Sequence, residues 1–162
     1  MRQLLFGSQQ GIAGMVYGTI VVMGAIAAGS DGEAEPWQLA TFAASTVLVL
    51  WLAHVYSHSL AETINAGRRL DRTELFDVMR RELPIPLAAV APVAALVLGA
   101  LDVMREAAAI RLALGIGLAT LALQGVRYAG VEGFSRAGTI VAIAVNLALG
   151  LVIVALEAAL AH

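Results

Sequence analysis

Five runs of apolar residues, each about as long as a bilayer-spanning helix, constrain this chain more than any other feature. A helix needs about 20 predominantly apolar residues to cross the hydrocarbon core of a membrane. No Asp, Glu or Lys lies at the centre of any of these runs, in keeping with the cost of an intramembrane charge. We therefore predict an all-α bundle of five transmembrane helices that forms a single domain. The predicted spans are roughly 11–29, 37–56, 85–101, 108–128 and 138–160.

The composition excludes several other classes of protein. Of the 162 residues, 60% are hydrophobic and only 14% are charged, against about 25% charged in a typical soluble domain. A soluble domain of this size cannot hide that much apolar surface from water. The chain has no cysteine and a net charge of −2, which excludes thiolate sites and gives no electrostatic footprint for nucleic acid. We expect a multi-pass protein of the bacterial plasma membrane, with the lipid bilayer as its surroundings.

The arginines predict the orientation of the five spans. Eight of the ten fall on one side of the predicted bundle: Arg2, Arg68, Arg69, Arg72, Arg80, Arg81, Arg127 and Arg136. Arg105 and Arg111 fall on the other side, and the first connection there carries Asp31, Glu33 and Glu35 without an arginine. Because cytoplasmic connections are rich in Lys and Arg, we predict the N-terminus inside and the C-terminus outside.

The one long connection, 57–84, contains a predicted amphipathic helix. Asp71 followed by Glu74 has the spacing of a capping box, and Pro84 ends the segment. Its apolar residues fall on one face: Leu75, Phe76, Met79 and Leu83. Such a helix either lies in the membrane interface or packs on the end of the bundle. Farther along, Pro92 interrupts the backbone hydrogen bonding of the third span, where we expect a kink.

His54, His58 and Glu62 are the candidate metal ligands. Their spacing of four residues places them on one helix face over roughly 12 Å, at the cytoplasmic mouth of the second span. Adjacent imidazole and carboxylate groups suit zinc or iron, so the stripe predicts a site for a divalent metal ion or for protons. The alternative is that the histidines are ordinary interfacial residues and that Glu62 pairs with an arginine.

The first span carries a second stripe, formed by Met15, Thr19 and Met23. These thioether and hydroxyl groups could line a route for a soft cation, or they could simply pack in the core. Small residues on the first and fifth spans favour close helix contacts, within the chain or across a dimer. They are Gly7, Gly11, Gly14 and Gly18, and Gly138, Ala142, Asn146 and Gly150. No phosphate loop, nucleophile elbow or H-E-x-x-H motif is present, so we do not expect an enzyme.

The pattern of spans resembles the vacuolar iron transporter family. Residues 14–21 are similar to that family's first-helix motif G-x-x-D-G-L-V, and 87–101 are similar to its third helix. The resemblance implies a homodimer that carries divalent iron in exchange for protons. The chain departs from the family at Tyr17, which replaces the motif's Asp, and in its much shorter and less acidic segment after the second span.

Two functional hypotheses follow from these patterns. In the first, the protein transports a divalent cation, with its path along the first span and its inner mouth at the histidine stripe. In the second, it is a non-transporting membrane module that acts as a partner subunit or a lipid-contacting scaffold. The second hypothesis rests on the scarcity of ionisable residues within the spans, since transporters usually carry at least one.

Overall fold

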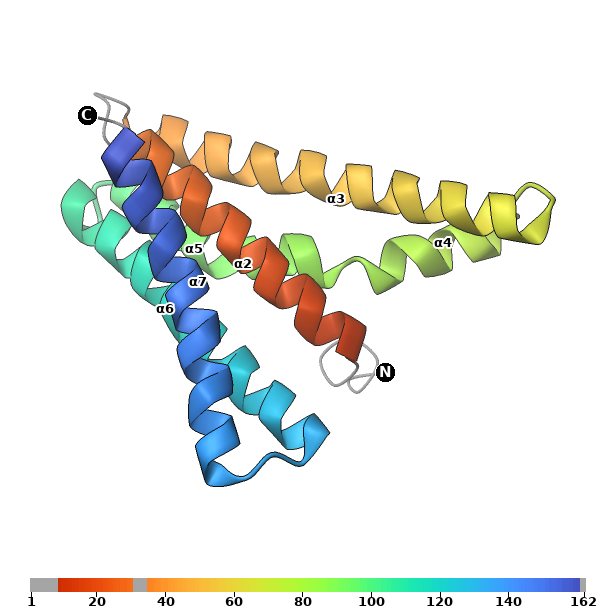
Figure 1. Cartoon of the computed structure of the whole chain (residues 1–162). Helices are drawn as coiled ribbons and strands as arrows, with labels where there is room; N and C mark the ends of the chain where they lie inside the picture. The colour runs from red at the N-terminus through yellow and green to blue at the C-terminus, as the bar shows by residue number, and fades with distance from the viewer. Residues whose placement is uncertain (1–8, 31–34, 161–162) are drawn as a thin grey trace.

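The computed structural model describes residues 9–30 and 35–160, and over these ranges helices are the only regular elements (Figure 1). This confirms the predicted all-α class. The helices are α2 (Gln9–Ser30), α3 (Pro36–Ala66), α4 (Arg72–Arg81), α5 (Pro84–Ala100), α6 (Glu106–Glu132) and α7 (Arg136–Leu160).

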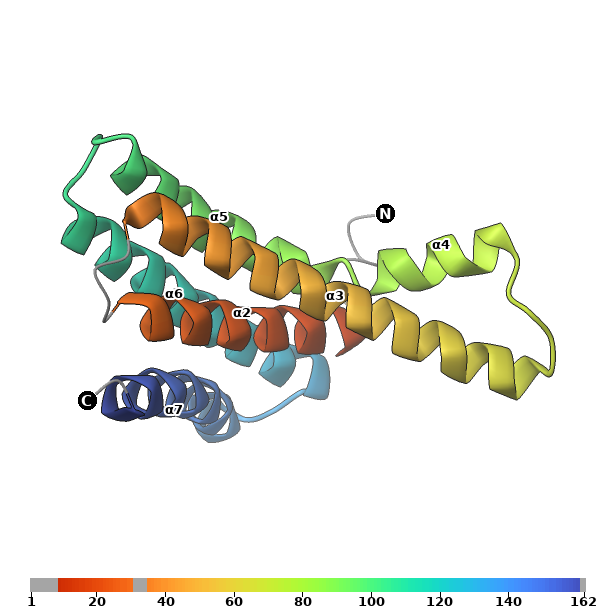
Figure 2. The same ribbon diagram turned by 90° about the horizontal axis from the view of Figure 1, so that it is seen from above.

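Helix α2 lies at the centre of the bundle and packs against α3, α5, α6 and α7. It is the most buried of the long helices, whereas α7 is the least buried. The helices converge where α2 ends and spread apart where it begins (Figure 1), and in the view from above α2 lies between α3 and α7 (Figure 2). At the spread end, the pair α3–α4 diverges from the pair α6–α7, and the start of α2 lies between them.

Each predicted span falls on a helix, and four of these helices are long and apolar enough to cross a membrane. The fifth, α5, has 17 residues and reaches that length only together with α4, from which it is separated by a bend of 48°. The described residues therefore include four or five helices of membrane-spanning character. Arg2, Asp31 and Glu33, on which the predicted orientation partly rests, lie outside the described residues.

Helix α3 continues ten residues beyond the predicted end of the second span at Tyr56. The residues from Ser57 to Ala66 are more polar but include no Gly or Pro, so nothing in them breaks the helix. It ends at Gly67, whose φ of 64° is the left-handed conformation that Gly adopts without strain. At about 1.5 Å per residue, the 31 residues of α3 exceed the roughly 30 Å hydrocarbon core.

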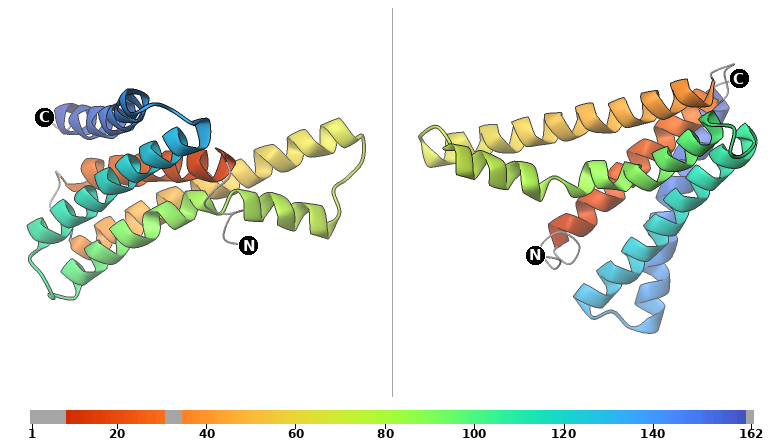
Figure 3. Two further views of the ribbon diagram at one scale, coloured as in Figure 1. Left: turned by 90° about the horizontal axis from the view of Figure 1, so that it is seen from below. Right: turned by 180° about the vertical axis from the view of Figure 1, so that it is seen from behind.

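Helix α4 begins at the predicted capping box. One carboxylate oxygen of Asp71 accepts hydrogen bonds from the backbone N–H groups of Thr73 and Glu74, both at 2.8 Å. The Glu74 carboxylate in turn accepts from the Asp71 backbone N–H. Helix α4 then runs back beside the end of α3 (Figure 3), and we call residues 57–81 the α3–α4 arm. The bend that follows lies between α4 and α5, while α5 itself runs through Pro92 as one helix.

The small residues of α2 make a close contact within the chain, one of the two arrangements predicted for them. A Cβ added at Gly18 would lie 2.3 Å from the Ile85 carbonyl oxygen and 3.0 Å from the Ala88 Cβ. At Gly14 the nearest atom would be the Pro84 Cβ, at 3.1 Å. The absence of side chains at these glycines therefore lets α2 cross directly over the start of α5. Gly7 lies outside the described residues.

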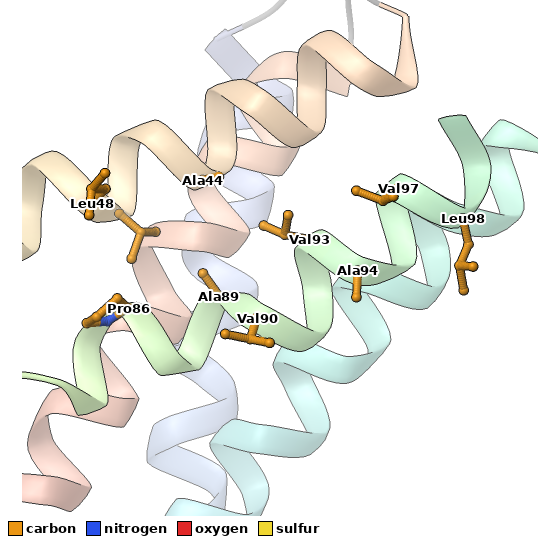
Figure 4. A pocket seen from close by; sticks show the side chains of 10 residues that line it. Ala44, Leu48, Pro86, Ala89, Val90, Val93, Ala94, Val97 and Leu98 are labelled. Carbon is orange, nitrogen blue, oxygen red and sulfur yellow. The ribbon is translucent and has the colours of Figure 1, made fainter. Parts of the chain in front are cut away.

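An apolar groove of about 690 Å³ runs between α3 and α5 (Figure 4). Its walls include Leu48 on α3 and Pro86, Val93 and Leu98 on α5. Helices α3 and α5 carry the predicted second and third spans. The apolar groove between them suits hydrocarbon better than water.

Candidate functional site

A polar hollow of about 290 Å³ lies at the spread end of the bundle, between α2, α3 and the α4–α5 bend. Four of its residues carry ring or carboxylate groups that can bind protons: Tyr17, His54, His58 and Glu82. The others are Gln10, Ala13, Gly14 and Ile85. Three separate elements thus contribute polar side chains to one small space.

His54 is oriented by its own helix. Its Nδ1 lies 3.1 Å from the carbonyl oxygen of Leu50, and a carbonyl can only accept a hydrogen bond. The contact therefore requires the proton on Nδ1, which leaves the Nε2 lone pair of the neutral ring free to accept a proton or bind a metal. The ring packs against that of Tyr17, with centroids 5.0 Å apart and planes tilted by 48°.

His58 lies one turn farther along α3 and contacts the bend before α5. Its Nδ1 is 3.2 Å from Oε1 of Glu82, whose side chain is only 19% exposed. The rings of His54 and His58 have centroids 6.2 Å apart. An imidazole and a carboxylate are therefore already in contact at the edge of the hollow, and a second imidazole lies next to them.

Glu62, the third member of the predicted stripe, is directed elsewhere. Its Oε1 accepts a hydrogen bond of 2.8 Å from the guanidinium of Arg81 on α4, as the alternative interpretation anticipates. Throughout the part of the chain that the structure describes, no three His, Cys, Asp or Glu side chains are grouped closely enough to hold a metal ion. The metal-binding assignment of His54, His58 and Glu62 stays a prediction.

Met15, Thr19 and Met23 do not contribute to the lining of the polar hollow. Thr19 is fully buried, and its hydroxyl donates to the Met15 carbonyl oxygen at 2.7 Å. Met23 is also fully buried and fills the space that Gly117 of α6 leaves open. In this arrangement the thioether of Met23 acts as core packing.

Glu82, Tyr17 and Gln10 are the site residues that the sequence patterns did not single out. The sequence does contain a signal for Glu82. It lies two residues before Pro84, where a charged segment meets an apolar one, and a helix tends to break just before a proline. Tyr17 appeared in the sequence only as a departure from a family motif. In the structure its ring lines the hollow and packs against the ring of His54.

Ion pairs fix the α3–α4 arm next to the hollow. Arg68 donates two hydrogen bonds to the Glu74 carboxylate, at 2.6 and 3.0 Å. Together with the N–H of Asp71, this guanidinium lowers the pKa of Glu74 to about 2. Three such pairs connect α3 or its C-terminal turn to α4 or the bend: Arg68–Glu74, Arg81–Glu62 and His58–Glu82. Charged contacts therefore set the position of α4 against α3.

No known protein-family model, curated protein or solved structure matches the chain. Its function must accordingly be argued from the geometry of the polar hollow and its surroundings.

Proposed function

We propose that the protein is a five-span membrane protein that binds a divalent metal cation in the polar hollow and carries it across the membrane. The observation on which the proposal rests is that His54, His58 and Glu82 line one small hollow at a helix break. In the arrangement described they are not yet close enough together to hold an ion, so binding would have to draw the three side chains around it. Imidazole and carboxylate together are ligands for Zn²⁺, Fe²⁺ and Mn²⁺. Transporters commonly bind ions where a membrane helix is interrupted.

The distribution of arginines supports an inward-facing hollow. Seven of the nine arginines within the described ranges lie at the end of the bundle that holds the hollow: Arg68, Arg69, Arg72, Arg80, Arg81, Arg127 and Arg136. By the positive-inside rule this end is cytoplasmic. A cation in the hollow would then exchange with the cytoplasm, and it would need His58 and Glu82 to separate so that both can act as ligands.

A second function is favoured by the packing beyond the hollow. Thr19 and Met23, deeper in α2, are fully buried, so the route predicted along this helix is closed in the arrangement described. A membrane module that binds a cation as a sensor or partner subunit, without moving it, fits this observation. The two functions share the hollow and differ in whether a metal crosses the bilayer.

Metal binding and metal flux can be measured separately. Titration of the purified protein with Zn²⁺, Fe²⁺ and Mn²⁺ should show binding of at least one, and His58→Ala and Glu82→Gln should each weaken it at least tenfold. Tyr56→Ala is the matched control, because Tyr56 is on the same helix but 70% exposed and outside the hollow. Equal affinity in all four proteins would refute the site.

The same proteins in liposomes test transport. Metal uptake above that of empty liposomes, lost in His58→Ala and kept in Tyr56→Ala, supports the transporter. Binding that depends on His58 without any uptake excludes the transporter and supports the non-transporting module.

A further inference from the structure

Helix α4 has an apolar face that is not used in the contact with α3. The residue of α4 buried against the rest of the protein is Val78, which is 1% exposed. Phe76 lies about 160° around the helix from Val78 and is 61% exposed, and Leu75 is 41% exposed. The face formed by Leu75, Phe76, Met79 and Leu83 is called the α4 stripe below.

Helix α5 also has an exposed apolar side, and it begins directly after the last residue of the α4 stripe, Leu83. Residues at intervals of three or four lie on one face of a helix, and on α5 these are Leu87, Val90, Ala94 and Leu98. Leu87, Val90 and Leu98 are among the exposed large apolar residues. An exposed apolar face on a membrane-spanning helix contacts lipid, and the α4 stripe adjoins this helix across a bend of 48°.

The charges around the α4 stripe are positive. Arg80 lies about 40° from Phe76 on the side away from Met79, and Arg72 lies one turn before Phe76, within the arc of the stripe. Neither forms an ion pair with any residue in the described ranges. The carboxylates nearby are occupied on the α3 side: Glu62 with Arg81, Glu74 with Arg68 and Glu82 with His58. Asp77 lies about 100° from Phe76, away from the stripe.

We infer that α4 lies on an anionic phospholipid surface, with the α4 stripe in the acyl boundary and Arg72 and Arg80 among the lipid phosphates. Exposed apolar side chains next to unpaired arginines match the two layers of such a surface, hydrocarbon below and negative charge above. The inference concerns a face that does not line the polar hollow, and it does not depend on metal binding or transport.

The absence of cysteine allows a clean test with single nitroxide labels. Phe76→Cys carries the label on the stripe, and Asp77→Cys carries the matched label at the next residue. Both full-length proteins are reconstituted in phosphatidylcholine vesicles with 30% phosphatidylglycerol. We expect the Phe76 label to collide with lipid-soluble oxygen and to be shielded from a water-soluble nickel chelate, whereas the Asp77 label is open to the chelate. If Phe76→Cys does not fold, Leu75→Cys provides the stripe label.

The arginines are tested on the same labelled protein. Each basic residue near an anionic surface contributes about fivefold to binding, so Arg72→Gln with Arg80→Gln should reduce the docked fraction roughly 25-fold in the equilibrium constant. Vesicles of phosphatidylcholine alone should produce a similar loss. Equal chelate access at Phe76 and Asp77, or identical docking in neutral and anionic vesicles, would overturn the inference. Spin–spin broadening at Phe76 that disappears on dilution with unlabelled protein would also overturn it, because it would show a second copy of the chain there.

Discussion

The contact of Gly18 with α5 leads to a quantitative prediction about stability. An added Cβ would lie 2.3 Å from the Ile85 carbonyl oxygen and 3.0 Å from the Ala88 Cβ. A carbon–oxygen contact of ordinary length is about 3.3 Å, so α2 and α5 would have to separate by about 1 Å. The obstacle is the backbone of a helix, which cannot turn away as a side chain can. Overpacking of this kind costs about 1–3 kcal/mol.

Gly115→Ala is the matched control for Gly18→Ala. Gly115 also lies inside a helix, but a Cβ there meets nothing within 4 Å. Both substitutions gain up to about 1 kcal/mol of helix propensity, and only Gly18→Ala creates a clash. With about 2–4 °C per kcal/mol for a chain of this size, we expect Gly18→Ala to melt several degrees below Gly115→Ala. Gly115→Ala should itself melt at or slightly above wild type.

The melting temperatures can be followed by the fluorescence of the native tryptophans, Trp37 and Trp51, in detergent micelles. Gly18 is adjacent to Tyr17, so the same separation would also enlarge the polar hollow and weaken the contact between Tyr17 and His54. A Gly18→Ala protein as stable as Gly115→Ala would refute the argument, because it would mean that α2 and α5 do not cross as closely as described.

Three further predictions concern polar groups. Gln124 is 1% exposed and its Oε1 has no hydrogen-bond partner among the described residues, so Gln124→Leu should leave the melting temperature unchanged or raise it. Asp71→Ala removes the cap of α4 and should cost about 1 kcal/mol, seen as faster hydrogen exchange of the first amides of that helix. The Glu74 carboxyl should titrate near its lowered pKa of about 2 in a carbon-13 NMR titration. The contribution of the ionised Glu74 carboxylate to the stability of the α3–α4 arm is therefore complete above about pH 4.5 and is lost as the pH falls toward 2. Arg68→Gln should return the pKa of Glu74 toward the ordinary range of a glutamate.

The helices themselves could be predicted because their signals are local. Apolar length places α2, α6 and α7 within a few residues of their observed ends, and the Asp71–Glu74 capping box gives the start of α4. The end of α3 could not be placed from hydropathy, since the residues after Tyr56 become more polar but remain helical. The signal for that end is Gly67, which supplies a left-handed conformation and not a change in polarity.

The candidate site was only half predictable for a different reason. His54 and His58 share one helix face, so their proximity follows from spacing alone. Glu82 reaches them from 24 residues farther along the chain than His58, after a turn and an antiparallel helix whose register no local pattern fixes. The same register brings Arg81 to Glu62 and so removes Glu62 from the stripe. Contacts of this kind depend on the length of the connection after Gly67 and on how α4 packs beside α3.

The bend between α4 and α5 connects the two surfaces discussed above. Glu82 in the bend contacts His58 at the edge of the polar hollow, and the next residue, Leu83, is the last member of the α4 stripe. Because charged contacts connect the bend and α4 to α3, a change in how α4 meets the membrane would be transmitted to Glu82 before it reached the packed core at Gly18. A cation that drew Glu82 away from His58 would in turn loosen the contact between the bend and α3. Metal affinity at the hollow and docking of α4 should therefore be energetically linked, and such a linkage must be equal in both directions.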